Sequence, residues 1–264
     1  MTDLTHNEMP RNVLVTGAGA GMGLAFARKF AANGHRVALF EKDSERAIHV
    51  ANDLSSTTGA NVLAVFGDVT DEVSIADGFS TVVDAFGSVD VLVNNAGISC
   101  NVPTESLTLE RWNEAISVNQ TGVFLASREF ARCHQSGRAG VIINVSSMYG
   151  QIAAPERLAY CASKSAVSMM TKALAIEWAD RGIRVNAIAP GYIDTPFLRA
   201  LSDEGRLSLD QIKGRTPQGR LGTAEEMAEL VAFLASEQNQ FMTGQVVTSD
   251  GGWSAYGYYE QHTE

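Results

Sequence analysis

The chain has 264 residues, and its 20 Lys and Arg against 30 Asp and Glu give a formal net charge of −10. This acidic balance excludes nucleic-acid partners and anionic membrane surfaces, because both are bound through cationic side chains. Hydrophobic residues make up 45% of the chain and charged residues 19%, which excludes a disordered or fibrous protein and indicates a globular one.

Short β-branched segments alternate with longer segments of helical periodicity along the chain. The predicted strands cover residues 12–16, 36–40, 62–66, 89–93, 141–145, 184–189 and 245–248. The predicted helices cover residues 22–33, 44–57, 72–86, 109–134, 158–180 and 224–235. Nearly continuous apolar strands and regular alternation predict an α/β fold with a doubly wound, seven-stranded parallel sheet and helices on both faces.

No linker or repeat divides the chain, so residues 12–264 are predicted to form one domain after a flexible tail over residues 1–11. Two segments depart from the alternation. Residues 191–220 contain two prolines and several glycines, which favours a mobile substrate lid. Residues 252–264 form an aromatic tail that packs either on a neighbouring subunit or on its own domain, and its aromatic residues are Trp253, Tyr256, Tyr258 and Tyr259.

Cysteine and histidine placement gives no sign of a disulfide or of a metal. Cys100, Cys133 and Cys161 are widely spaced, and the five histidines are scattered without zinc-ligand spacing. The N-terminal residues lack the apolar segment of a signal peptide, and no apolar run approaches the roughly 18 residues that cross a bilayer. We therefore expect a soluble, cytoplasmic protein with reduced thiols, no membrane partner and no metal.

The first predicted strand ends in a glycine-rich turn, T-G-A-G-A-G-M-G over residues 16–23, that runs directly into a helix. Glycines let a backbone approach a pyrophosphate closely, and a helix N-terminus attracts the anion. The spacing T-G-x-x-x-G-x-G differs from the commoner G-x-G-x-x-G, and a merely flexible turn is the alternative. The candidate phosphate-binding residues are Gly17, Gly19, Gly21, Met22 and Gly23.

Acidic residues follow the second and third predicted strands. Glu41 can accept hydrogen bonds from the adenosine ribose hydroxyls and would repel a 2′-phosphate, which favours NAD over NADP. The adjacent Lys42 opposes this preference, and Glu41 could also be an ordinary surface charge. Asp68 and Val69 can bracket the adenine, although a helix N-cap would equally explain the aspartate.

A serine, a tyrosine and a lysine form the candidate catalytic group. Ser147 ends the fifth strand, and thirteen residues later Tyr160 and Lys164 stand at i and i+4, on one helix face. A free tyrosine, with a pKa of about 10, is a poor acid or base near neutrality. A neighbouring ammonium and an oxidised nicotinamide would lower the pKa of Tyr160, while Ser147 holds the substrate oxygen.

With these residues, the chain resembles the compact, single-domain branch of the short-chain dehydrogenase/reductases, which have a Rossmann-type fold. The resemblance extends from Asn12 to Gly252. It rests on the residue 16–23 loop together with Asn94-Asn95-Ala96-Gly97, Asn119, Ser147, Tyr160, Lys164, Pro190-Gly191 and Asp250-Gly251-Gly252.

The resemblance implies a catalytic tetrad of Asn119, Ser147, Tyr160 and Lys164. Tyr160 would be the general acid and base, Ser147 would polarise the substrate oxygen, and Lys164 would bind the nicotinamide ribose. Asn119 would hold a water. The resemblance also implies homo-oligomers, dimers or tetramers, paired through the helices at 109–134 and 158–180. The further residues expected along the cofactor are Asn95, Ala96, Gly97, Pro190, Gly191, Ile193 and Thr195, although the segment 94–97 could equally be a turn that stabilises the sheet.

Substrate identity follows least directly from the sequence. Gln151 and Arg157 suggest a polar pocket suited to a sugar, a polyol or a hydroxy acid, whereas Arg157 could instead pair within its own helix. The expected activity is NAD-dependent interconversion of a secondary alcohol and a ketone. The alternatives are an NADPH-dependent 3-oxoacyl thioester reductase and a non-catalytic nucleotide-binding regulator. The expected pocket residues are Ser99, Cys100, Met148, Gln151, Ala153, Arg157, Tyr192, Phe197 and Leu201.

Overall fold

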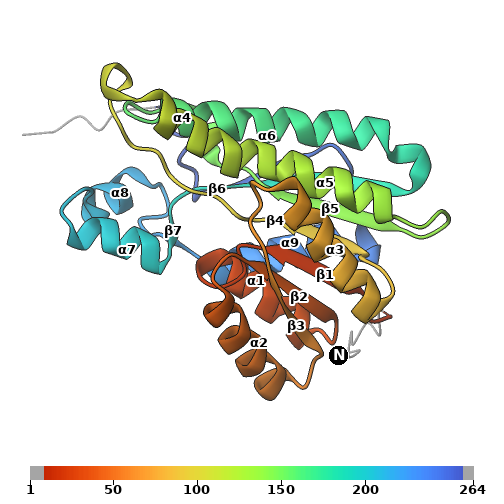
Figure 1. The fold of residues 1–264 in the computed structure, drawn as a ribbon. Coiled ribbons are helices and arrows are strands. Elements are labelled where there is room, and N and C mark those ends of the chain that lie inside the picture. The colour runs from red at the N-terminus through yellow and green to blue at the C-terminus, as the bar shows by residue number, and fades with distance from the viewer. Residues whose placement is uncertain (1–8, 258–264) are drawn as a thin grey trace, which may run out of the picture.

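A seven-stranded parallel sheet forms the centre of the computed structural model, which describes residues 9–257 (Figure 1). The strand order is β3-β2-β1-β4-β5-β6-β9, and every neighbouring pair is parallel. This order confirms the predicted doubly wound sheet. The strands are β1 (Asn12–Thr16), β2 (Arg36–Glu41), β3 (Val62–Phe66), β4 (Val91–Asn94), β5 (Gly140–Val145), β6 (Ile183–Pro190) and β9 (Val246–Ser249).

Helices cover both faces of the sheet (Figure 1). One face is covered by α1 (Gly21–Ala32), α2 (Ser44–Thr58) and α9 (Ala224–Ala235). The opposite face is covered by α3 (Glu72–Phe86), α5 (Gly122–Cys133) and α6 (Leu158–Glu177). The short helix α4 (Leu109–Ile116) lies against α6.

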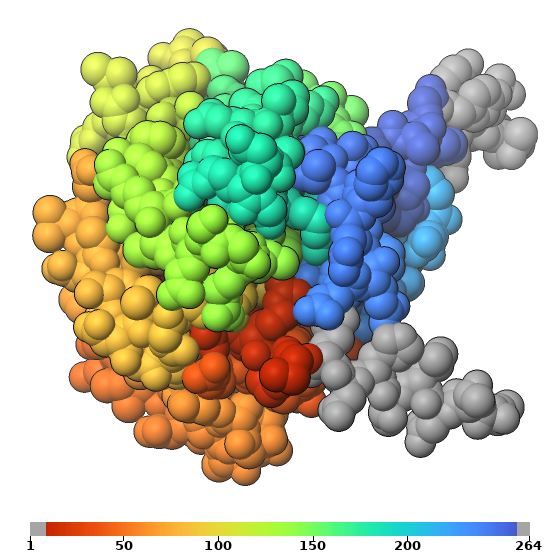
Figure 2. Space-filling view, turned by 90° about the vertical axis from the view of Figure 1, so that its right-hand side faces the viewer, coloured from red at the N-terminus to blue at the C-terminus, as the bar shows by residue number. Residues whose placement is uncertain are grey.

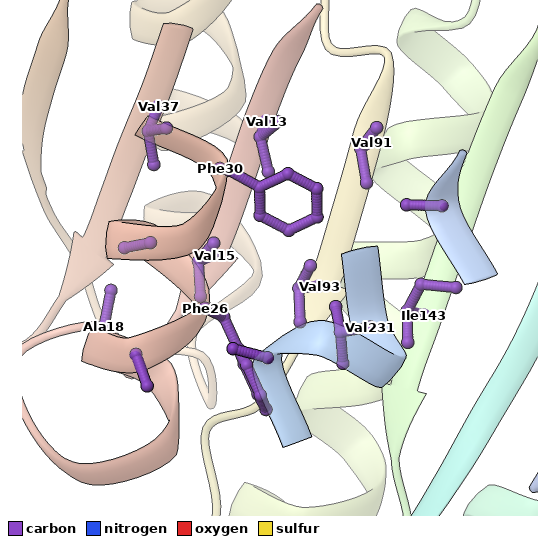
Figure 3. Close-up of a cluster of buried hydrophobic side chains, with 14 of the residues drawn as sticks. Val13, Val15, Ala18, Phe26, Phe30, Val37, Val91, Val93, Ile143 and Val231 are labelled. Carbon is purple, nitrogen blue, oxygen red and sulfur yellow. The ribbon is translucent and has the colours of Figure 1, made fainter. Parts of the chain in front are cut away.

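Alternate residues of each central strand point into different cores. Val13 and Val15 of β1 pack under α1 and α9, while Leu14 between them packs against the opposite helical layer. The first of these cores is drawn in Figure 3, where Phe26 and Phe30 of α1 lie over the strand valines. Burial on both faces explains why the strands read as continuous apolar runs in the sequence.

The helix predicted over residues 109–134 is divided by a wider turn. A π-helical segment, Ser117–Thr121, separates α4 from α5 and contains Asn119. Such turns occur mostly inside α-helices and frequently at functional sites. Helical periodicity did not predict the π-helical turn, because residues 117–121 contain no proline or glycine that would mark a break in a helix.

The predicted lid, residues 191–220, is an ordered segment with secondary structure of its own. It contains β7 (Ile193–Asp194), α7 (Pro196–Asp203) and α8 (Leu209–Arg215). Strand β7 pairs in parallel with β8 (Gly222–Thr223), which anchors the end of the segment. In Figure 1, α7 and α8 stand apart from the two main helical layers.

The described part of the aromatic tail packs on its own domain. The Trp253 ring lies 5.1 Å from the Tyr192 ring, and the Arg215 guanidinium lies 4.9 Å from the rings of both Trp253 and Tyr256. Arg215 also donates a hydrogen bond to the Tyr256 carbonyl at 2.8 Å. Figure 2 shows the dark blue C-terminal segment beside the light blue lid. Tyr258 and Tyr259 lie outside the described residues.

The predicted N-terminal tail, residues 1–11, falls mostly outside the described residues as well. Its last residue, Arg11, is fixed to the fold, because its guanidinium donates to the Ala235 carbonyl at the end of α9, at 2.6 Å. His35 is buried beside the Phe30 ring. Between residues 9 and 257, no helix has the length and apolar character needed to cross a membrane.

Candidate active site

The strand order changes direction between β1 and β4, and the candidate site lies at the carboxyl ends of these strands. Ligands of open α/β sheets bind in the crevice at such a switch point. A cleft of about 790 Å³ lies there. The predicted cofactor residues that line it are Gly17, Gly21, Met22, Glu41, Asp68, Val69, Asn95, Ala96, Gly97 and Thr195.

The glycine-rich turn has the geometry of a phosphate cradle. Gly17 and Gly21 adopt φ values of +62° and +54°, which L side chains rarely tolerate. A Cβ atom on Gly23 would lie 2.2 Å from the Gly17 carbonyl oxygen. Helix α1 has Ala20 at its N-cap and no acidic residue in its first turn, whereas α2, α3 and α9 are capped by side chains. The N–H groups of the first turn of α1 are therefore available for a pyrophosphate, and the turn fits a dinucleotide.

Glu41 lines the cleft and also holds the glycine-rich turn by a hydrogen bond. Its Oε2 accepts a hydrogen bond from the Gly19 N–H at 3.0 Å, and its Oε1 accepts one from the Lys42 N–H at 3.0 Å. The Lys42 ammonium pairs with the Asp68 carboxylate at 2.7 Å. Lys42, which opposed the NAD preference in the sequence, therefore has its charge compensated.

Arg46 is a cleft residue that the sequence analysis missed. Its side chain lies across the glycine-rich turn, since a Cβ atom on Gly19 would be 2.6 Å from the Arg46 Cδ atom. It pairs with Asp43 at 3.0 Å in the first turn of α2. Its position five residues after Glu41, in the first turn of α2, is the sequence signal that could have identified it.

The segment 94–97 joins the glycine-rich turn to β4. The Thr16 Oγ1 accepts hydrogen bonds from the backbone N–H groups of Asn95 and Ala96, and the Asn95 Nδ2 donates to the Thr16 and Gly17 carbonyls. These bonds support the interpretation of the segment as a stabilising turn. Asn95, Ala96 and Gly97 also line the cleft, and their contact with a cofactor stays a prediction.

Asn119 is fully buried in the π-helical turn. Its Oδ1 accepts from the Ile98 N–H at 2.8 Å, and its Nδ2 donates to the Ile98 carbonyl at 2.9 Å and to the Ser163 Oγ at 3.2 Å. A Cβ atom on Gly97 would lie 3.3 Å from the Asn119 Oδ1 and 3.5 Å from the Lys164 Nζ. Asn119 thus fixes the loop after β4 beside Lys164, a structural role that the sequence did not reveal.

The structure brings Ser147, Tyr160 and Lys164 together at the carboxyl end of β5. The Ser147 side chain lies beside the Tyr160 hydroxyl, where it lowers the pKa of Tyr160. The Lys164 Nζ lies 5.9 Å from the centre of the Tyr160 ring and donates to the Val145 carbonyl at 2.8 Å. Ser147 precedes a 3-10 turn and Tyr160 lies in the first turn of α6, and the group adjoins the cleft through Gly97, where a Cβ atom would lie 3.5 Å from the Lys164 Nζ.

Burial has the largest effect on the ionisation of these groups. It raises the pKa of Tyr160 above its ordinary value, while the Ser147 hydrogen bond and the Arg157 charge lower it. Burial lowers the pKa of Lys164 to about 8. The protein's own residues therefore leave Tyr160 protonated near neutrality. A phenolate requires additional positive charge, which an oxidised nicotinamide would supply.

Arg157 lies above this group, beside two tyrosine rings. Its guanidinium is 5.0 Å from the Tyr149 ring and 6.0 Å from the Tyr192 ring, and the two tyrosine hydroxyls are 3.0 Å apart. The alternative of an ion pair within its own helix is not observed among residues 9–257. From the sequence, Met148 and not its neighbour Tyr149 was predicted as a pocket residue. Met148 itself is buried.

Gln151 does not lie with the other pocket residues, which corrects the prediction. Its side-chain amide donates to the Thr248 Oγ1 of β9 at 3.0 Å, and the residue lines a separate groove between α6 and β9. Gln151 directly follows the 3-10 turn Met148–Gly150, at its C-cap.

Several other predicted pocket residues have different surroundings. Cys100 is buried in a small cluster with Ala115 and Ala159, and Leu201 is buried in α7. Phe197 is exposed and lines the nucleotide cleft, Ser99 is half-buried, and Ala153 is exposed.

The residues after β6 were expected along the nicotinamide. Pro190 is buried at the end of β6, and Ile193 packs into the core near α9. Gly191 and Ile193 line a smaller cavity of about 140 Å³ that also contains Asp250. A Cβ atom on Gly191 would lie 2.7 Å from the Asp250 Cα, so glycine is required by this close approach.

Comparison with known proteins gives matches over most of the chain. A sequence profile for the family described as enoyl-(acyl carrier protein) reductase matches residues 17–254. The 3beta-hydroxysteroid dehydrogenase 1 of Eggerthella lenta is 40% identical over 251 residues, which cover 93% of this chain and 94% of that protein. The 2-(R)-hydroxypropyl-CoM dehydrogenase of Xanthobacter autotrophicus is 38% identical over 250 residues, which cover 94% of this chain and 100% of that protein. The glucose 1-dehydrogenase of Gluconobacter oxydans is 38% identical over 253 residues, which cover 96% and 95%.

Solved structures agree with these matches. A short-chain type dehydrogenase/reductase from Mycobacterium marinum superposes with a TM-score of 0.87 at 34% identity, covering 92% of this chain and 95% of that one. A protein from Agrobacterium tumefaciens assigned as a 2-deoxy-D-gluconate 3-dehydrogenase, solved with bound NADP, gives a TM-score of 0.84 at 35% identity, covering 93% and 97%. Similarity over most of the chain, together with the glycine-rich turn and the Ser-Tyr-Lys group, shows that this chain is an oxidoreductase of the short-chain dehydrogenase/reductase family.

Proposed function

We propose that this chain is a nicotinamide-dependent dehydrogenase that interconverts a polar secondary alcohol and its ketone. The observation that carries the proposal is the grouping of Tyr160, Ser147 and Lys164 beside the glycine-rich cleft. The relatives support it, because their names specify a hydroxysteroid, glucose and a hydroxypropyl compound as substrates.

Each catalytic side chain has a defined task in this reaction. The nicotinamide, when bound, accepts or supplies the hydride. The Tyr160 oxygen takes the proton of the alcohol during oxidation and returns it during reduction. Ser147 donates a hydrogen bond to the substrate oxygen and orients it toward Tyr160. Lys164 binds the nicotinamide ribose, and its positive charge favours the phenolate form of Tyr160. For Asn119, the water-holding role stays a prediction beside its observed bonds to Ile98.

We favour NAD(H) over NADP(H) as the cofactor. Glu41 faces the cleft with a carboxylate that would repel a 2′-phosphate, and Asp68 compensates the charge of Lys42. Arg46 is the opposing cation, although Asp43 pairs with it. The bound NADP of the Agrobacterium tumefaciens relative belongs to that protein, so the selectivity of this chain requires its own measurement.

A second candidate is reduction of a 3-oxoacyl thioester, favoured by the description of the matching family profile. The net charge of −10 opposes it, because an acidic carrier protein would need a basic docking surface. Both activities would use the same hydroxyls, so only substrate turnover can separate them.

We further propose that residues 191–220 form a substrate lid and that the chain forms homo-oligomers. Phe197 of α7 lines the cleft, which supports the lid.

Met169 and Ile176 of α6 are 62% and 81% exposed, which supports a subunit contact through α6. Changing Ile176→Asp should then lower the mass measured by sedimentation equilibrium, and an unchanged mass would exclude this contact. The three free cysteines favour a cytoplasmic location.

The experiment that tests the proposed function follows nicotinamide absorbance with NAD⁺ and NADP⁺ across polyols, aldoses, hydroxy acids, simple secondary alcohols and 3-hydroxyacyl thioesters. We expect NAD⁺ reduction on one class of polar alcohols. Turnover on the thioesters alone would favour the second candidate. Binding of the nucleotide without turnover on any class would contradict both and indicate a non-catalytic binding protein.

A further inference from the structure

Arg157 presents a guanidinium at the substrate side of Tyr160. It stands at the N-cap position of α6 but makes no capping bond with its side chain. Its guanidinium lies 5.0 Å from the Tyr149 ring and 6.0 Å from the Tyr192 ring, and its Nη2 lies 3.5 Å from the Tyr192 hydroxyl. Its charge also lowers the pKa of Tyr160, so it acts on the hydroxyl where the substrate oxygen would bind.

This positive charge has no carboxylate partner among residues 9–257, although the chain has ten more acidic than basic residues. Several other guanidiniums among the described residues are bound by carboxylates or carbonyls, whereas Arg36 lies 5.6 Å from the Phe86 ring. Arg199, for example, pairs with Asp194 at 2.7 Å, and Arg215 donates to the Tyr256 carbonyl. The Arg157 guanidinium lies over aromatic rings, and only its Nη2 has a hydrogen-bond contact, the 3.5 Å one to Tyr192, so its other N–H groups remain for a ligand.

The backbone holds Arg157 in place through a strained residue. Glu156 has φ +61° and is the only residue other than glycine with a positive φ in the described range. Its carbonyl accepts a hydrogen bond from the Val102 N–H at 2.8 Å, which ties it to the loop after β4. Conformations of this kind cost free energy and concentrate at active sites and ligand clamps. The positive φ of Glu156 therefore fits a residue whose backbone conformation directs the Arg157 side chain.

The aromatic wall beside Arg157 is fixed from the other side. Tyr192 packs edge-on against Trp253 at 5.1 Å, and Trp253 is held by Arg215 of the lid helix α8. The Tyr149 and Tyr192 hydroxyls bond each other at 3.0 Å. A rigid wall limits the rotamers of Arg157 and lowers the entropy lost when its N–H groups bind.

We propose that Arg157 binds an oxyanion carried by the substrate, so that the preferred substrate is an anionic hydroxy or oxo compound rather than a neutral polyol. This inference rests on the proposed dehydrogenase function and specifies its substrate class. A planar guanidinium matches the two oxygens of a carboxylate, and it also matches a sulfonate or phosphate oxyanion. The oxyanion would lie several bonds from the carbinol carbon, because Tyr160 must reach the reacting oxygen.

The test compares matched acids and amides that differ only in charge. The probes are 3-oxobutanoate, 4-oxopentanoate and 5-oxohexanoate, each with its amide, together with the sulfonate and phosphate analogues of the tightest acid. Calorimetry measures their dissociation constants for the protein saturated with oxidised nucleotide, which has no hydride to give to a ketone. Binding is measured in place of turnover, so the result does not depend on catalysis of these ketones.

We expect at least one acid to bind about tenfold or more tightly than its amide, as for a hydrogen bond to a charged group. The preference should disappear in Arg157→Gln and be reduced in Arg157→Lys, which keeps the charge but loses the planar fork. It should persist in Glu156→Gly, since glycine adopts a positive φ, and in Lys172→Gln, which removes an exposed cation from the same helix. The sulfonate and phosphate analogues rank the oxyanions.

Equal binding of every acid and its amide would overturn the proposal, as would a preference that survives Arg157→Gln. Neither result would affect the proposed function if neutral alcohols are oxidised. Conversely, an Arg157-dependent preference without turnover on any alcohol would support the anion site and contradict the dehydrogenase proposal.

Discussion

The two ends of the central sheet both contain buried polar and charged groups, but the ends differ in how the charged groups are paired. At the amino end, Asp90 before β4 accepts hydrogen bonds from the Asn12 N–H at 3.0 Å, the Ser88 Oγ at 3.0 Å and the Arg138 guanidinium at 2.7 Å. The Asp90 carboxylate and the Arg138 guanidinium at this end are therefore paired with each other within the protein.

At the carboxyl end, the charges are only partly compensated. The buried Lys164 ammonium donates to the Val145 carbonyl, and the Arg157 guanidinium contacts two aromatic rings and a hydroxyl. Groups left incompletely satisfied reduce stability but remain available for a ligand. The comparison teaches that one sheet supports two kinds of polar site, one for stability at its amino end and one for chemistry at its carboxyl end.

The largest effect is expected from removal of the Tyr160 hydroxyl. In Tyr160→Phe, kcat/KM for the alcohol should fall by about 10²- to 10⁴-fold, because the proton loses its acceptor. Nucleotide affinity and the unfolding midpoint should stay close to those of the parent protein. Steady-state kinetics checks this result, and turnover within a few fold of the parent would show that another group moves the proton.

At the other end of the sheet, Asp90→Ala should lower the free energy of unfolding by about 3 kcal/mol. The change leaves the Asn12 N–H and the Ser88 hydroxyl without their acceptor and leaves Arg138 unpaired. Urea unfolding measures the loss. Folded protein should turn over substrate at the normal rate, and a stable but inactive variant would contradict the division between the two ends.

Replacement of the buried ammonium should stabilise the fold. Lys164→Met should raise the free energy of unfolding by about 2 kcal/mol at neutral pH, because the folded parent holds a buried charge there. Burial lowers the pKa of Lys164 from 10.5 to about 8. Below pH 8 both states hold the proton and the full cost of burial is present.

Between those two pKa values the unfolded chain keeps a proton that the folded chain has released, so the parent gains stability as pH rises. The advantage of Lys164→Met should therefore shrink between about pH 8 and pH 10.5. Urea unfolding at several pH values would reveal this trend. An advantage that grows with pH would show that the Lys164 ammonium is stabilised in the folded protein.

The smallest effect concerns cofactor choice. In Glu41→Ala, affinity for NADH should fall by about tenfold, and the preference over NADPH should narrow, because the ribose hydroxyls lose an acceptor and the 2′-phosphate loses a repulsive charge. Fluorescence titration with each nucleotide measures both. The matched variant Glu45→Ala, in the first turn of α2, should change neither affinity. An unchanged selectivity in Glu41→Ala would assign cofactor choice to Arg46.

Much of this architecture was predictable because it is encoded in local patterns. The bounds of β1, β3, α3 and α9 agree residue for residue with the predictions, since β-branched runs and helical periodicity end at clear turn residues. The lid helices α7 and α8 were not predicted. The two helices have 8 and 7 residues, so each is too short to show a recognisable helical periodicity. The prolines and glycines of the segment also favour loops.

The candidate site likewise has one part that the sequence predicts and another part that it does not. The Ser147, Tyr160 and Lys164 group follows from spacing along a strand end and one helix face. The direction of Gln151 and the contact of Arg46 with the glycine-rich turn depend on side-chain rotation across elements. The stacking of Arg157 on Tyr149 and Tyr192 likewise joins residues from separate parts of the chain, so spacing could not predict it.

The most direct test of the division between the two ends measures stability and turnover together in Lys164→Met and Asp90→Ala. We predict opposite results: Lys164→Met is more stable than the parent and has lost turnover, while Asp90→Ala is less stable and keeps turnover per folded molecule. If Lys164→Met lost stability together with turnover, or if Asp90→Ala were fully stable yet inactive, the account of a structural end and a chemical end would be contradicted.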